Sequence, residues 1–132
     1  MRLRSILVLV VLAGAALLPG QALLGLASSG ATAVTRVIPC TGVGGPQFKP
    51  KTFLLACADA NSYVSHITWT SWTSNGARGL GTLRENECNP NCVSGQFTSS
   101  PTTIVLSQPV ASHYGKLFSV VVVGSITIHL RF

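Results

Sequence analysis

The sequence predicts an all-β fold: a small antiparallel β-sandwich or barrel of about seven or eight short strands, after an N-terminal signal helix. Beyond its N-terminus the chain divides into short segments rich in β-branched and aromatic residues, separated by Gly, Pro and Asn turns. No stretch of that part repeats its apolar residues every 3.6 positions, as an amphipathic helix would. All four cysteines also lie there, as is typical of a small domain cross-linked by disulfides.

The first 33 residues have the layout of a secretory signal peptide. Arg2 and Arg4 provide a basic start, and a long apolar run follows. The small residues of Ala31-Thr32-Ala33 suit the cleft of signal peptidase. We therefore expect export, cleavage after Ala33 and a secreted, extracytoplasmic location.

A retained membrane anchor is the competing interpretation of the same segment. Ser5–Ala27 contains 23 residues, enough to span a bilayer. Against an anchor, Pro19-Gly20-Gln21 interrupts the apolar run and no cluster of charges follows it. Cleavage leaves residues 34–132 as a single disulfide-linked β domain.

The mature part divides into strands and turns in a regular order. After an extended start at 34–38, the segments expected as strands are residues 51–58, 62–71, 77–83, 96–106 (two short strands, or one bent at Ser99–Pro101), 117–123 and 126–131. The intervening loops and turns are expected at residues 41–50, 58–61, 73–76, 85–94, 107–115 and 124–125. The glycines of 77–83 predict a bulge or a close approach by another backbone. Gly124-Ser125 suits a type II′ hairpin turn.

Alternation over residues 62–71 places aromatic side chains on defined faces of the strand. Tyr63 and Trp69 share one face, and Thr68 and Thr70 share the other. Trp69 and Trp72 are three residues apart, so they should point to opposite faces, Trp69 into the core and Trp72 outward. An exposed indole can stack on a sugar ring or anchor a protein partner. Trp72 and Tyr63 are therefore candidate ligand contacts, although Trp72 can also simply cover the end of a sheet.

Four cysteines allow three disulfide pairings. Cys40–Cys57 and Cys88–Cys92 are favoured because closure between residues near in sequence is easiest. Zinc binding is the other use of four cysteines, but neither spacing matches a zinc knuckle. We expect no metal and no cofactor. The closed turn Cys88–Cys92 presents Asn89 and Asn91, which are further candidate ligand contacts.

Few residues are available for catalysis. Glu85 and Glu87 would share a strand face ~6.7 Å apart, a spacing that overlaps that of inverting glycosidases, yet a solvated strand end is the simpler interpretation. Asp59 could complete a serine hydrolase triad with a histidine, but no G-x-S-x-G elbow is present. Closing a turn through nearby backbone N–H groups explains Asp59 more simply. The histidines, whose convergence the sequence does not reveal, are His66, His113 and His129.

The basic residues are scattered along the sequence. The net charge is +6 for the whole chain and +4 once Arg2 and Arg4 leave with the signal. A nucleic-acid footprint needs a dense basic stripe, so nucleic-acid binding is not expected. Mild attraction to phospholipid or cell-wall polymers is expected instead, and attachment to a membrane only through an uncleaved N-terminus.

Three segments together carry a family resemblance. Phe53–Asn61, Ile67–Trp72 and Cys88-Asn89-Pro90-Asn91-Cys92 resemble a group of small secreted actinobacterial proteins of uncharacterised function. The resemblance covers about Pro39–Gln108 and implies export and paired cysteines, but no active site.

The residues predict a noncatalytic binding or structural module of the cell envelope or secretome, with a glycan or an envelope protein as its partner. A small protease inhibitor that presents the clamped loop Cys88–Cys92 is the first alternative, because a rigid loop loses little entropy on binding. A hydrolase using the few carboxylates and histidines is the second.

Overall fold

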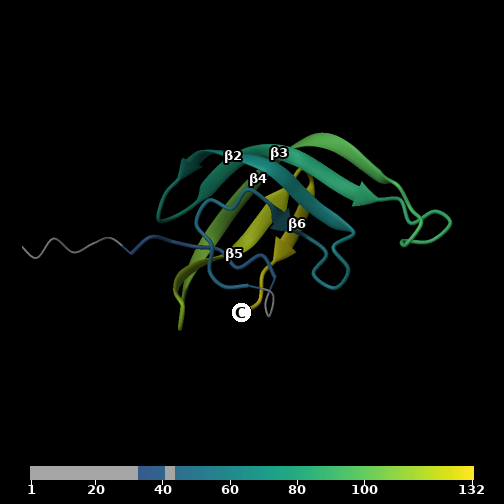
Figure 1. The fold of residues 1–132 in the computed structure, drawn as a ribbon. Helices are drawn as coiled ribbons and strands as arrows, with labels where there is room; N and C mark the ends of the chain where they lie inside the picture. The colour runs from purple at the N-terminus through teal and green to yellow at the C-terminus, as the bar shows by residue number, and fades with distance from the viewer. Residues whose placement is uncertain (1–32, 41–43) are drawn as a thin grey trace, which may run out of the picture. The chain divides into compact units, whose positions relative to one another are not determined.

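In the computed structural model, residues 33–40 and 44–132 are described. The expected signal segment lies outside them apart from Ala33. Their regular structure is entirely β, as predicted, and residues Ala31–Phe132 form one compact unit. The strands are β1 (Phe53–Leu54), β2 (Ser62–Trp72), β3 (Ala77–Asn86), β4 (Phe97–Ser112), β5 (Gly115–Val123) and β6 (Ile126–His129). They form one antiparallel sheet in sequence order, which curls so that β5 and β6 lie beneath β2 and β3 (Figure 1).

The described residues form six strands, not the seven or eight expected, because β4 is a single strand of 16 residues and the extended start at 34–38 forms only isolated bridges. Of the two possibilities for residues 96–106 the structure has the single strand, and the loop expected around Pro109 is absent. Phe97–Leu106 pairs with β3 and Ile104–Ser112 pairs with β5. Each proline therefore lies where β4 has one neighbouring strand. A strand edge tolerates proline because the missing N–H need not remove a ladder hydrogen bond.

The predicted strand 51–58 shortens to the two residues of β1. Instead of a longer strand, the residues before β1 close the inner side of the curl through isolated contacts (Figure 1). We call these residues, 33–40 and 44–52, the N-terminal segment. Val37 bridges Gln47 through two backbone hydrogen bonds of 3.0 and 2.8 Å, and Ile67 N–H donates to the Lys51 carbonyl at 3.0 Å. This segment thus covers the core where no regular strand does.

Two irregularities in β2 decide which side chains face the core. The register of β2 against β3 shifts between Ser65 and Thr68 and again between Trp69 and Ser71. At the first shift His66 has a positive φ of 52°. As a result Val64 and Ile67, three residues apart, are both fully buried, which a regular alternating strand would not allow.

The glycines of β3 allow this bulged strand to come close, as the sequence predicted. A Cβ atom on Gly81 would lie 2.7 Å from Val64 Cγ1 and 2.9 Å from the Ser65 carbonyl oxygen. A Cβ atom on Gly79 would lie 3.0 Å from Ile67 Cγ2. Any larger residue at these positions would push β2 away from β3.

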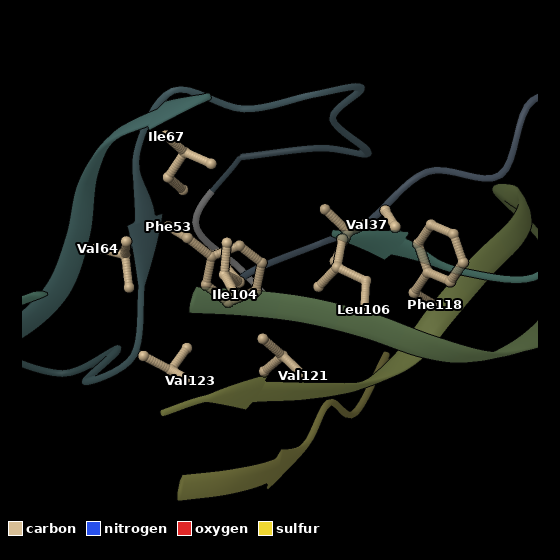
Figure 2. Close-up of a cluster of buried hydrophobic side chains, with 10 residues drawn as sticks. Val37, Phe53, Val64, Ile67, Ile104, Leu106, Phe118, Val121 and Val123 are labelled. Atoms are coloured by element: carbon tan, nitrogen blue, oxygen red, sulfur yellow. The ribbon is translucent and has the colours of Figure 1, made fainter. Parts of the chain in front are cut away.

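The core gathers side chains from every part of the sheet except β6, together with the N-terminal segment (Figure 2). Its buried members are Val37, Phe53, Val64, Ile67, Ala77, Ile104, Leu106, Phe118, Val121 and Val123. The hairpin between β5 and β6 has the expected two-residue turn, in which Gly124 adopts a φ of +57°.

Candidate functional site

Both disulfides have the predicted pairing. Cys40 is bonded to Cys57 with a Cα–Cα distance of 5.5 Å, and Cys88 to Cys92 with a Cα–Cα distance of 3.7 Å. Two disulfides in a domain of this size are typical of extracellular proteins. The second disulfide closes the loop between β3 and β4, at the end of the sheet opposite the N-terminal segment (Figure 1).

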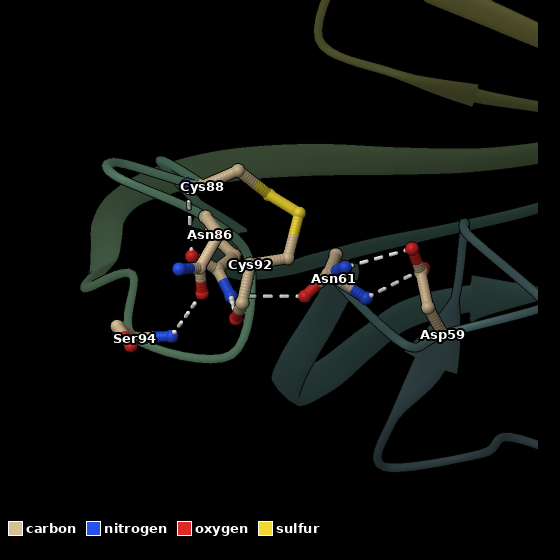
Figure 3. Close-up of a disulfide and its surroundings, with 7 residues drawn as sticks. Asp59, Asn61, Asn86, Cys88, Cys92 and Ser94 are labelled. Carbon is tan, nitrogen blue, oxygen red and sulfur yellow. Dashed lines mark hydrogen bonds between the residues drawn. A yellow bond between two sulfur atoms is a disulfide. The ribbon is translucent and has the colours of Figure 1, made fainter.

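Asn86, the last residue of β3, fixes the base of this loop (Figure 3). Its side-chain oxygen accepts a hydrogen bond from Cys88 N–H at 3.0 Å. Its side-chain amide donates to the Cys92 carbonyl at 2.8 Å and to the side-chain oxygen of Asn61 at 2.9 Å. One side chain therefore holds both ends of the disulfide loop and ties them to the turn before β2.

The turn before β2 is itself closed by Asp59, as the sequence predicted (Figure 3). The Asp59 carboxylate accepts hydrogen bonds from the backbone N–H of Asn61 at 3.1 Å and from its side-chain amide at 2.7 Å. These bonds favour the ionised form and hold the pKa of Asp59 below its ordinary value. Asp59 thus positions Asn61, and Asn61 in turn contacts Asn86.

Beside this network, two aromatic rings and an arginine lie on the same face of the sheet. Tyr63 is paired with Arg84 across β2 and β3. The ring centres of Tyr63 and Phe97 are 5.8 Å apart, and the Arg84 guanidinium carbon lies 5.8 Å from the centre of the Phe97 ring. Phe97 is 38% exposed. We call Tyr63, Arg84, Phe97 and the Cys88–Cys92 loop the loop end.

One hydrogen-bond donor of the Arg84 side chain has no partner in the described part of the chain. Its Nε is buried and has no hydrogen-bond partner among the described residues. The residue as a whole is half-buried, so its exposure comes from its other atoms. Glu85, its neighbour, is paired with Ser62 and Thr98 and belongs to the opposite face of the strand. A guanidinium beside an aromatic ring offers donors to the hydroxyl or carbonyl oxygens of a ligand that packs on that ring.

The structure brings three of the four predicted contact residues to the loop end. Tyr63 is half-buried, while Asn89 and Asn91 are exposed within the disulfide loop. The side-chain oxygen of Asn91 accepts a hydrogen bond from Ser94 N–H at 3.0 Å, so this side chain shapes the loop. Asn89 precedes a cis proline. Their role in ligand binding stays a prediction.

The predicted orientation of Trp72 is wrong. The second shift in β2 turns Trp72 to the same side as Trp69, and their rings meet edge to face at 4.7 Å. Trp72 also packs edge to face on Phe48 and Phe118, and its indole N–H donates to the Thr35 carbonyl at 2.8 Å. Trp72 is half-buried against the core and lines a surface hollow with Phe48. It lies at the end of the sheet far from Tyr63.

The remaining candidate catalytic groups are dispersed. β3 ends at Asn86, so Glu85 is in the strand and Glu87 is beyond it. His66 sits at the bulge of β2, His113 in the turn between β4 and β5, and His129 in β6. Among residues 33–40 and 44–132 no group of three or more His, Cys, Asp and Glu side chains is arranged to hold a metal ion.

Sequence reasoning missed Arg84, Asn86 and Phe97. The predicted strand ended at Leu83 and the predicted loop began at Glu85, which left Arg84 unassigned and put Asn86 in the loop. Leu83-Arg84-Glu85-Asn86 contains one apolar residue followed by three polar ones, so no alternation signalled that the strand continues. Phe97 could not be placed beside Tyr63 without the register of three strands.

Comparison of the chain with family models, curated proteins and solved structures gave no match. In the described part of the chain no helix has the length and apolar character needed to cross a membrane.

Proposed function

We propose that this chain is an exported, noncatalytic binding module of the cell envelope or secretome, and that its ligand is a glycan held at the loop end. The observation that carries the proposal is the Tyr63–Arg84–Phe97 cluster beside a rigidly held loop. Aromatic rings provide flat apolar faces for a sugar ring. Arg84 provides hydrogen-bond donors to hydroxyl groups. Because its side chain is already partly removed from water, ligand binding costs little further desolvation energy.

Local charge favours an uncharged ligand over a polyanion. All three side-chain carboxylates of the chain are at this end of the sheet: Glu87 follows β3, Asp59 is tied to Asn86 through Asn61, and Glu85 is on the opposite face of β3. They offset the single positive charge of Arg84 and repel a string of phosphates or carboxylates. A neutral polysaccharide of the envelope therefore fits the loop end better than an acidic one.

A glycan array probed with the purified protein tests this proposal. Arg84→Gln removes the guanidinium and should weaken binding by roughly 10–100-fold, the effect of losing a hydrogen bond from a charged donor. Arg78→Gln is the matched control, because Arg78 is an exposed arginine at the other end of β3. Equal binding by both variants, or loss in both, would contradict a glycan site at Arg84.

A protease inhibitor remains the second candidate, and the clamped loop favours it. Asn86 and the disulfide hold the loop, and Val93 beside it is 98% exposed. A rigid exposed segment is what a protease cleft accepts without a large loss of entropy. The test is inhibition of a panel of secreted proteases by a stoichiometric amount of the protein. Inhibition that is lost in Asn86→Asp but kept in Arg84→Gln would favour this function over glycan binding.

A further inference from the structure

The end of the sheet that carries the N-terminal segment differs in character from the loop end. We call it the basic end and define it as Val34, Arg36, Phe48, Lys49, Val110, Tyr114 and Lys116. Three of these residues are basic, and none of the chain's three carboxylates belongs to it. Four are large apolar or aromatic residues with high exposure, namely Val34 (52%), Tyr114 (50%), Phe48 (47%) and Val110 (39%).

Contacts between backbone segments hold these residues together. Arg36 N–H donates to the Lys116 carbonyl at 3.0 Å and the Arg36 carbonyl accepts from Phe118 N–H at 2.9 Å, which ties the backbone of the N-terminal segment to the start of β5. Tyr114 is in the turn that leads to Lys116, and Val110 is paired with Leu117 across that hairpin. The β4–β5 hairpin and the N-terminal segment therefore meet at one end of the sheet (Figure 1).

The second half of the basic end surrounds Phe48. The Lys49 ammonium lies 5.4 Å from the centre of the Phe48 ring. Val34 and Phe48 line the same surface hollow, with Trp72 as its wall. One cation, Lys49, thus stands directly beside an exposed aromatic ring.

From this placement we propose that the basic end rests on a membrane surface rich in anionic lipid headgroups. Each Lys or Arg near such a surface contributes favourable electrostatic energy, and tyrosine and apolar side chains enter the interface between headgroups and acyl chains. The three basic residues of this end are complementary in charge to anionic lipid headgroups, and this is why we propose a membrane surface as the partner. The inference rests on the proposed export and leaves the loop end facing away from the bilayer.

Vesicle co-sedimentation tests it with the protein purified from its producing cells, its intact mass recorded. Vesicles of phosphatidylglycerol mixed with phosphatidylcholine should bind the protein, and vesicles of phosphatidylcholine alone should not. Lys116→Gln should weaken binding about 5-fold, and the double variant with Arg36→Gln about 25-fold, from the usual contribution of one cation at an anionic surface. Tyr114→Ser should also weaken binding, because it removes an aromatic ring from the interface.

Lys51→Gln is the matched control. Lys51 is an exposed lysine just before β1. It lies beside His66, which is in the middle of β2, away from both ends of the sheet. It should bind vesicles as the unchanged protein does. Near-ultraviolet circular dichroism checks that each variant keeps its packing.

Every outcome decides the inference. Equal binding to both kinds of vesicle, or equal binding by the basic-end variants and Lys51→Gln, overturns it. Another result is that a soluble polyanion binds as tightly as vesicles do, with no effect of Tyr114→Ser. That result overturns the inference in favour of a wall polymer. If vesicle binding fails while the glycan array depends on Arg84, the proposed function stands and only this inference falls.

Discussion

Replacing Gly81 by alanine tests the close approach of β2 to β3. The new Cβ would lie 2.7 Å from Val64 Cγ1, 2.9 Å from the Ser65 carbonyl oxygen and 3.2 Å from Ile67 Cγ1. One of these neighbours is backbone at a bulge, and the other two are fully buried side chains. None of them can move without disturbing the core.

The expected cost follows from two opposing effects. Forcing an extra carbon into a packed interior costs about 1–3 kcal/mol. Alanine also restricts the unfolded chain, which offsets about 0.4–1 kcal/mol. The net loss of stability is therefore about 1–2 kcal/mol. For a domain of this size that corresponds to a fall in Tm of roughly 4–16 °C.

Thermal unfolding followed by circular dichroism measures the effect. Gly45→Ala is the matched control, since a Cβ there would meet no atom within 4 Å; its Tm should stay the same or rise slightly. A Gly81→Ala variant that melts no lower than Gly45→Ala would refute the close contact at the bulge. The burial of Val64 and Ile67 on one face through the first bulge of β2 would then lose its support.

Three further predictions concern the aromatic cluster, a disulfide and a turn. Trp72→Phe should lower the free energy of unfolding by about 1–3 kcal/mol, because it leaves the carbonyl of the N-terminal segment without its donor; urea unfolding measures this, and an unchanged midpoint would argue against that hydrogen bond. Replacing Cys40 and Cys57 together by serine should cost about 3 kcal/mol, from the loop of 17 residues that their bond closes; a much smaller loss in urea would indicate that the unfolded chain is already constrained. The lowered pKa of Asp59 stabilises the fold above its ordinary pKa of 3.8, and that contribution is lost as the pH falls through the folded-state value. Asp59→Asn should therefore have a Tm that depends less on pH below about pH 4 than the unchanged protein has, and parallel curves would contradict the carboxylate's role in the turn.

The β class, both disulfides and the Gly124 hairpin could be predicted from the sequence because each depends on residues close together in the chain. A disulfide between Cys88 and Cys92, or a two-residue turn, is decided within a few positions. Periodicity and turn chemistry report such local choices directly.

The outward orientation of Trp72 could not be predicted because it depends on pairing. Each bulge in β2 adds a residue that alternation does not anticipate, and the later side chains change face. The loop expected at Pro109 was wrong for a related reason. Whether proline is tolerated in a strand depends on how many neighbours that stretch has, and this is decided by the partner strands.

The long strand β4 has a consequence for solubility. Residues 97–103 pair only with β3, and residues 107–112 pair only with β5, so each stretch has one edge without a strand partner. Such unpaired edges favour pairing with other molecules and aggregation. Pro101 lies in one stretch and Pro109 in the other. Because proline offers no N–H to an incoming strand, each interrupts the hydrogen bonds that a second molecule would need, which helps keep the domain dispersed at high concentration.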